Sequence, residues 1–133
     1  MQSAELSVVV PTYKERGNVA ELVRRLDAAL AGISWEAIFV DDNSPDGTSE
    51  AVKAIAASDR RVRCLRRVGR RGLAGACIEG MLSSASPFVA VMDADLQHDE
   101  KVLPQMLAKL RQGDADLIAG TRYVEGEIGR AHV

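Results

Sequence analysis

Short apolar runs rich in β-branched residues alternate with helical stretches along the chain, and this alternation constrains the fold more than any other feature. The runs at 6–10, 37–40, 62–65, 88–92 and 117–119 predict five strands. Apolar residues at helical spacing lie between them, at 19–30, 51–56, 73–81 and 102–110. Strands separated by helices favour a mostly parallel sheet covered on both faces. The sequence therefore predicts a doubly wound α/β fold, with residues 1–133 forming a single domain.

Local signals refine two of the predicted helices. Asn18 is followed three residues later by Glu21, a capping-box spacing that predicts the start of a helix at residue 18. In the helix expected over 72–84, the period places four apolar side chains on one face: Leu73, Cys77, Ile78 and Met81.

Composition excludes several classes of protein. With 47% hydrophobic and 27% charged residues and a net charge of −2, the chain is neither disordered nor a dedicated nucleic-acid module. No apolar run approaches the roughly 20 residues that span a bilayer, and the N-terminus does not resemble a signal peptide. Cys64 and Cys77 are too few for a disulfide framework, so we expect a reduced, cytoplasmic setting.

Polar clusters follow four of the predicted strands. They occupy residues 11–15, 41–42, 93–97 and 120–123. In parallel sheets, ligands bind beyond the carboxyl ends of the strands. The sequence therefore predicts that these clusters converge on one edge of the sheet and form a binding site there.

Asp93 and Asp95 stand one residue apart, directly after the apolar run 88–92. Hard cations such as Mg²⁺ or Mn²⁺ prefer oxygen ligands and commonly share one or two carboxylates with substrate phosphates. Gln97 offers a third oxygen, which suits such a cation better than the neighbouring His98 would. We therefore expect a divalent metal cofactor that holds a diphosphate.

Two adjacent carboxylates, Asp41 and Asp42, end the second strand. Asp41 either caps the turn at 43–47 or faces the site. Asp42 is the better candidate for binding a hydroxyl or a base N–H of the ligand. Tyr13 and Glu15 also allow two interpretations. Tyr13 could stack on a base and Glu15 could bind the ligand. Alternatively, both side chains could lie in a solvated loop.

Seven arginines fall between residues 60 and 71, and most are expected to line a solvated strand edge. Arg70 and Arg71 stand at a glycine-flanked helix start, where backbone N–H groups attract phosphate. An anionic membrane surface is an alternative partner, at about 1 kcal/mol per basic residue. The glycines at 69, 72 and 75 lack the spacing of a dinucleotide-binding loop and do not follow the first strand. The arginines are Arg60, Arg61, Arg63, Arg66, Arg67, Arg70 and Arg71.

Taken together, the segments 8–18, 40–48, 72–76, 92–98 and 120–123 resemble the GT-A glycosyltransferases of family 2. Within that family the chain is most similar to the polyprenyl-phosphate (dolichol-phosphate) mannosyltransferases and their glucosyl relatives. The resemblance implies a Rossmann-like GT-A fold and a metal-dependent, inverting transfer of a hexose to a polyprenyl phosphate carrier. The donor it implies is GDP-mannose, with a UDP-sugar as the alternative.

The resemblance also implies a role for each matching residue. The nucleotide-sugar pocket would be formed by Pro11, Tyr13, Glu15, Val40, Asp42, Arg71, Asp93 and Ala94. The metal would be held by Asp93, Asp95 and Gln97. Asp95 and Arg122 would be catalytic, with Arg122 facing a phosphate of the donor or of the acceptor. The chain departs from the family pattern at His98 and Asp99, near which proline is more usual.

Family members are longer, so we expect this chain to be the donor-binding portion of a larger enzyme at the cytoplasmic face of a membrane. Peripheral membrane contact and self-association through an exposed edge are further expectations. Two other classes use similar sheet edges. A nucleotidyltransferase would open with a glycine-rich basic loop, whereas residues 11–16 here are Pro-Thr-Tyr-Lys-Glu-Arg. A receiver-like Mg²⁺-binding domain would carry its acidic pair after the first strand, whereas the pair here follows the second.

Overall fold

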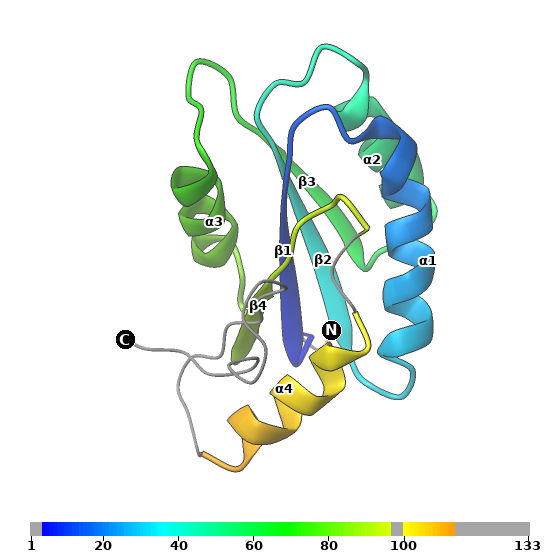
Figure 1. Cartoon of the computed structure of the whole chain (residues 1–133), viewed down its shortest axis with the longest axis vertical. Helices are drawn as coiled ribbons and strands as arrows, with labels where there is room; N and C mark the ends of the chain where they lie inside the picture. The colour runs from blue at the N-terminus through cyan, green and yellow to red at the C-terminus, as the bar shows by residue number, and fades with distance from the viewer. Residues whose placement is uncertain (1–3, 97–99, 114–133) are drawn as a thin grey trace.

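A four-stranded parallel sheet forms the centre of the computed structural model, which describes residues 4–96 and 100–113 (Figure 1). The strands lie in the order β3-β2-β1-β4. Their bounds are β1 Leu6–Thr12, β2 Trp35–Asp41, β3 Val62–Arg66 and β4 Phe88–Val91. The first four predicted strands are thus confirmed, whereas the fifth, at 117–119, lies outside the described residues.

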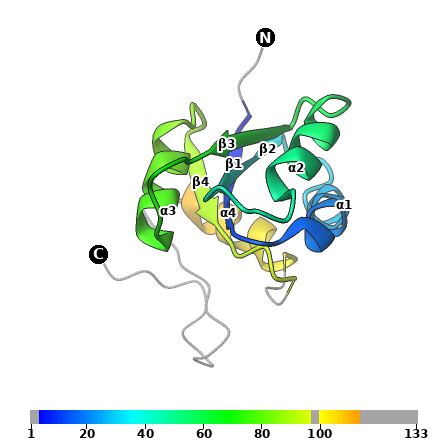
Figure 2. The ribbon, with the colours of Figure 1, turned by 90° about the horizontal axis from the view of Figure 1, so that it is seen from above.

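Helices cover both faces of this sheet (Figure 2). A single 3-10 turn, η1 (Arg16–Asn18), leads into the first helix. The helices are α1 Val19–Ala29, α2 Thr48–Ala56, α3 Leu73–Leu82 and α4 Val102–Arg111. Helices α1, α2 and α4 pack on one face, and α3 packs on the other. In the described part of the chain, no helix is long and apolar enough to cross a membrane.

The larger core lies between the sheet and the helices α1, α2 and α4. Leu22 and Leu26 of α1 meet Val8 and Phe39 of the sheet, and all four side chains are fully buried. Burying side chains of this size contributes about 1.5–3 kcal/mol each. This core fixes the strands whose carboxyl ends carry the polar clusters.

Helix α3 packs on the opposite face through two small residues, Ala76 and Gly80. A Cβ atom added at Gly80 would lie only 2.4 Å from Cγ1 of Val9, so the helix backbone approaches the sheet closely. The apolar residues predicted to share one face are largely exposed, with Leu73 at 64% and Ile78 at 52%. The hydrophobic period therefore misidentifies the packing face of α3, because close approach to buried valines selects small residues.

The predicted capping box at the start of α1 is wrong. The amide of Asn18 donates to Oε2 of Glu15 at 2.8 Å and makes no cap hydrogen bond. Glu21 accepts hydrogen bonds from Arg24 and Arg25 one turn further along the helix. The two guanidinium groups therefore bind the carboxylate of Glu21, which in a capping box would accept the backbone N–H of Asn18.

Candidate functional site

The carboxyl ends of β1, β2 and β4 meet at one edge of the sheet. In the strand order, β2 lies on one side of β1 and β4 on the other, so the direction of winding reverses between β1 and β4. Such a switch point opens the crevice in which α/β proteins bind ligands. The predicted convergence of the first three polar clusters is confirmed, while the cluster at 120–123 lies outside the described residues.

Among the residues that the structure describes, each of the three loops at this edge contains one non-glycine residue in the left-handed backbone region. These are Lys14 after β1, Asn43 after β2 and Leu96 after β4, with φ values of 57°, 56° and 62°. Side chains adopt this region rarely, and residues that do so cluster at ligand sites. All three turns thus bend sharply at the same edge of the sheet.

Asp41 is fully buried and caps the turn after β2. Its Oδ1 accepts hydrogen bonds from the hydroxyls of Thr12 at 3.0 Å and Ser44 at 2.5 Å. Its Oδ2 accepts the backbone N–H of Ser44 at 3.0 Å. The structure therefore supports the first alternative for Asp41, in which its side chain caps the turn at 43–47.

Asp42 is nearly buried, at 8% exposure, and points to the other side of the strand end. Its Oδ2 accepts the backbone N–H of Gly72 at 3.0 Å. Its Oδ1 lies 3.3 Å from Nη1 of Arg67 but accepts no hydrogen bond from the described residues. This oxygen is itself shielded from solvent, so a ligand would reach it only after the adjacent side chains shift.

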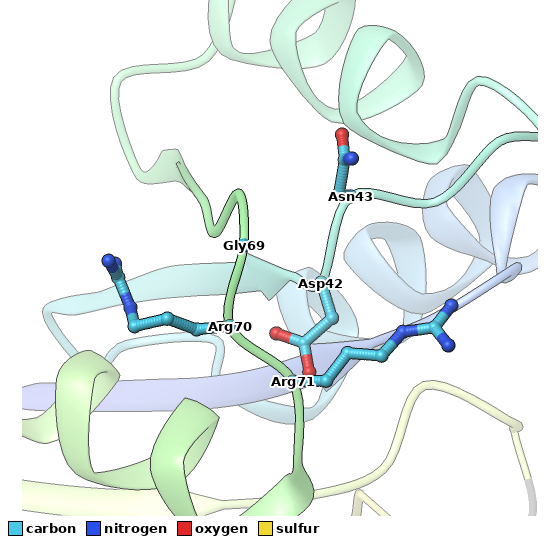
Figure 3. A pocket seen from close by; sticks show the side chains of 5 residues that line it. All are labelled: Asp42, Asn43, Gly69, Arg70 and Arg71. Carbon is cyan, nitrogen blue, oxygen red and sulfur yellow. The ribbon is translucent and has the colours of Figure 1, made fainter.

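A pocket of about 300 Å³ opens beside Asp42 (Figure 3). Its lining consists of Asp42, Asn43, Gly69, Arg70 and Arg71. The side chains of the two arginines extend away from one another in Figure 3, and Arg70 pairs with Glu79 at 3.0 Å. One carboxylate among basic and amide groups makes this a pocket for a polar, partly anionic molecule.

Tyr13 and Arg71, both predicted to bind the nucleotide, are in contact. The guanidinium carbon of Arg71 lies 4.2 Å from the centroid of the Tyr13 ring, and Nζ of Lys14 lies 5.5 Å from it. Cations are attracted to the face of an aromatic ring at such distances. The partly exposed ring and its two cations thus offer a stacking surface beside positive charge.

The other residues predicted for the nucleotide pocket differ in their accessibility. Glu15 is half-buried, and its carboxylate is engaged by Asn18. Pro11 is also half-buried and pairs in register with Val40 of the neighbouring strand. Val40 is fully buried, so in this structure it supports the site without facing the solvent.

Asp93 and Asp95 follow β4 and are both half-buried, with the buried Ala94 between them. Burial raises the pKa of the Cys77 thiol on α3, and the nearby carboxylate of Asp93 raises it further. Two carboxylates at a strand end are hard oxygen donors and fit a divalent cation. Among the residues described, no group of three acidic, histidine or cysteine side chains completes a metal site. The predicted Gln97, like Arg122, lies outside the described residues.

One buried residue near the site was not predicted from the sequence. Arg67, the first residue after β3, is only 4% exposed and forms ion pairs with Asp42 and Glu79. It belongs to a run of seven arginines that was expected to be largely solvated. No local pattern distinguishes it from its neighbours, because its partners come from distant parts of the sequence.

A parallel sheet with acidic residues and basic loops at its carboxyl ends is typical of α/β proteins that bind nucleotides. The sequence profile of glycosyl transferase family 2 matches residues 7–131, and the chain belongs to this family.

Two relatives share about two fifths of their residues with this chain over the matched region. A dolichol-phosphate mannosyltransferase of Pyrococcus furiosus is 41% identical over 122 residues, which cover 92% of this chain and 34% of the relative. A dolichol-phosphate mannosyltransferase of Saccharomyces cerevisiae is 39% identical over 127 residues, covering 93% and 47%. The chain thus spans between about a third and a half of the length of these relatives.

Solved structures share the fold. A mannosyltransferase from Pyrobaculum calidifontis in complex with GDP-Man and Mn²⁺ is 25% identical, with a TM-score of 0.62 over 90% of this chain and 35% of that one. A glucosyl-3-phosphoglycerate synthase from Mycobacterium tuberculosis, in complex with Mn²⁺, UDP-glucose and phosphoglyceric acid, is 18% identical, with a TM-score of 0.70 over 92% and 45%. The Rossmann-like GT-A fold expected from the sequence is therefore confirmed.

Proposed function

We propose that this chain forms the donor-binding part of an enzyme that transfers mannose from GDP-mannose to the phosphate of dolichol or another polyprenyl carrier. The observation that carries the proposal is the identity of about 40% with two dolichol-phosphate mannosyltransferases over more than nine tenths of the chain. The geometry agrees with it, since the pocket beside Asp42 combines a carboxylate with basic residues.

The nucleotide base would bind at the carboxyl end of β2. A guanine ring presents N–H donors on its edge, and the carboxylate of Asp42, whose buried Oδ1 accepts no hydrogen bond from the described residues, would accept one of them. The face of Tyr13 lies beside this pocket and would support the flat base, with Arg71 moving aside or stacking next to it. Base binding would thus use two side chains that the sequence places 29 residues apart.

The diphosphate would lie toward the end of β4, where Asp93 and Asp95 would hold Mg²⁺ or Mn²⁺ and Ala94 would back onto the nucleotide. The Mn²⁺ in the complex of the Pyrobaculum calidifontis mannosyltransferase supports dependence on a divalent cation. When bound, the cation would stabilise the negative charge that develops on the leaving diphosphate. Neutralising Asp93 and Asp95 would therefore affect donor binding as well as turnover.

The acceptor would react without help from a strong base. A phosphate oxygen of the lipid carrier is already anionic, so it can attack the anomeric carbon directly. The bond from that carbon to the diphosphate breaks as the bond to the acceptor forms, and the configuration inverts. Arg122 would face one of the phosphates during this step.

A UDP-sugar is the second candidate donor. Uracil also presents a ring N–H that one carboxylate oxygen can accept, and a structural neighbour with this fold is solved with UDP-glucose. The difference between the two candidates lies in the base that the pocket beside Asp42 prefers.

Calorimetric titration of the purified chain with GDP, UDP, GDP-mannose and UDP-glucose, each with and without Mn²⁺, tests the proposal. We expect Mn²⁺-dependent binding of GDP and GDP-mannose. Asp95→Asn should weaken that binding by about tenfold or more, a free-energy change of about 1.4 kcal/mol. Asp27→Asn is the matched control, because Asp27 is an exposed residue of α1 that pairs with Arg61.

The outcomes separate the candidates. A preference for UDP would replace the guanine donor by the uracil donor. Failure of the folded chain to bind any of the four ligands would contradict the assignment of this sheet edge as a donor site. Unchanged Mn²⁺-dependent binding in Asp95→Asn would show that the metal is held elsewhere.

A further inference from the structure

We propose that Arg67 is a positioning residue that holds the carboxylate of Asp42 and the loop 68–72 in the geometry that receives the base. Arg67 does not line the pocket and is almost completely buried, so it would act through Asp42. The inference rests on the proposed function in one respect, namely that the pocket beside Asp42 binds the base of a nucleotide.

The guanidinium of Arg67 joins two segments around the site. Its Nη1 donates to the carbonyl oxygen of Gly72 at 3.0 Å and lies 3.3 Å from Oδ1 of Asp42. Its Nε lies 2.7 Å from Oε2 of Glu79. The end of β2, the start of α3 and the middle of α3 therefore meet at one buried cation.

Gly72 is hydrogen-bonded to both Asp42 and Arg67, and together these contacts form a cross-link between the end of β2 and the start of α3. Its N–H donates to Asp42, while its carbonyl accepts from Arg67, so this one residue is bound from both sides. The backbone of Gly72 has φ of +127°, a conformation that residues with side chains rarely adopt. Asp42, Arg67 and the loop that carries Arg70 and Arg71 are thus fixed relative to one another.

Gly75 provides the space for this cross-link. A Cβ atom at this position would lie 2.8 Å from Nη2 and 3.3 Å from Nη1 of Arg67. The guanidinium would have to shift, although Asp42, Gly72 and Glu79 hold it on its other sides. The glycines at 72 and 75 therefore serve the placement of Arg67.

The chemistry of arginine suits this role better than that of lysine. The guanidinium carries five N–H donors on a planar fork, so one side chain can lie beside a carbonyl and two carboxylates at once. A lysine would keep the positive charge but would not reach all three partners. The charge of Arg67 neutralises Asp42 in its buried position, although Oδ1 accepts no hydrogen bond from the guanidinium.

This arrangement predicts a selective defect. Without the cross-link, Asp42 and residues 68–72 would lose their fixed geometry, and the interaction with the base would weaken. Binding of a diphosphate at Asp93 and Asp95 depends on a different strand and should persist. The affinity for GDP should therefore fall, while the affinity for inorganic pyrophosphate with Mn²⁺ should not.

The experiment compares Arg67→Lys and Gly75→Ala with the wild-type chain by calorimetry, using GDP and inorganic pyrophosphate, both with Mn²⁺. Gly75→Ala displaces the guanidinium without changing any charge, and it replaces a helical glycine by the best helix former. We expect GDP affinity to fall by about tenfold or more in both variants. Pyrophosphate affinity should stay within about twofold, which is less than 0.5 kcal/mol.

Arg63→Gln is the matched control. Arg63 lies on β3, the strand that directly precedes Arg67, and pairs with a carboxylate, Glu36, at 2.9 Å, but Glu36 belongs to the amino-terminal half of β2. This variant removes an equivalent charge and ion pair from β3 away from the site. Binding of GDP and pyrophosphate by Arg63→Gln should match the wild type.

A second measurement does not depend on any nucleotide. The N–H of Gly72 is protected by Asp42, so its hydrogen exchange should accelerate in Arg67→Lys and Gly75→Ala but not in Arg63→Gln. If the wild type bound no nucleotide, the proposed function would fail, while the exchange at Gly72 would still test the cross-link. The positioning role of Arg67 would be overturned if both variants bound GDP as tightly as the wild type does. It would also be overturned if folded Gly75→Ala lost GDP binding and pyrophosphate binding equally.

Discussion

Replacing Gly80 by alanine tests how tightly α3 is packed on the sheet. The added Cβ would lie 2.4 Å from Cγ1 of Val9 and 3.0 Å from Cγ2 of Val40, well inside van der Waals contact. Both valines are fully buried in the sheet and have no free space into which to move. The helix would therefore have to shift away from the strands that carry the site.

Two opposing terms set the size of the effect. Overpacking of a buried contact costs about 1–3 kcal/mol. Alanine regains about 1 kcal/mol of helix propensity relative to glycine. At a separation of 2.4 Å the steric cost should be near the upper end, so Gly80→Ala should destabilise the fold by about 1–2 kcal/mol.

Urea unfolding followed by circular dichroism measures this difference. Gly17→Ala is the control, because no heavy atom lies within 4 Å of the Cβ that it would add. Its free energy of unfolding should stay within about 0.5 kcal/mol of the wild type. If Gly80→Ala were as stable as Gly17→Ala, the close packing of α3 on Val9 and Val40 would not be what holds this helix in place.

Three further predictions concern stability. Asp41→Ala should lower the free energy of unfolding by about 2–4 kcal/mol in urea titrations, because it leaves three buried donors without their acceptor. Arg24 and Arg25 lower the pKa of Glu21 from 4.5 to about 2, so the stability that the ionised carboxylate contributes is complete above pH 4.5 and lost as the pH falls through 2. The difference in urea midpoint between the wild type and Glu21→Gln should therefore shrink over that range. Leu82→Ala, at a side chain that is 79% exposed, should change stability by less than about 0.5 kcal/mol, whereas Leu107→Ala should cost about 2–5 kcal/mol.

The strands could be predicted from the sequence because their local pattern agrees with their environment. The β-branched residues 8–10 are fully buried between helices on both sides, as a continuous apolar run suggests. The apolar run 6–10 predicts a strand that ends before Pro11, yet β1 continues through Thr12. The pairing with β4 ends at Val9, so Pro11 has no neighbour on that side and its missing N–H is not needed there.

The packing of α3 and the burial of Arg67 could not be predicted in the same way. Periodicity shows that residues 73–82 form a helix, but the shape of the sheet decides which face packs, and here it selects Ala76 and Gly80. Arg67 is buried because Asp42 lies 25 residues before it and Glu79 lies 12 after it, so its environment exists only in the folded chain.

The adjacent carboxylates Asp41 and Asp42 show how one strand end serves both fold and site. Successive side chains of a strand point to opposite faces, and the neighbouring residues follow this rule, since Phe39 belongs to the core with α1 and α2 and Val40 to the core with α3. Asp41 accordingly turns to Thr12 and Ser44 and fixes the loop, while Asp42 turns to Gly72 and Arg67 and lines the pocket. The repulsion expected between neighbouring charges is thereby avoided, because each carboxylate has its own donors on its own face. Exchanging the two roles would require a one-residue shift of β2, which would also move every buried side chain of that strand to the opposite face.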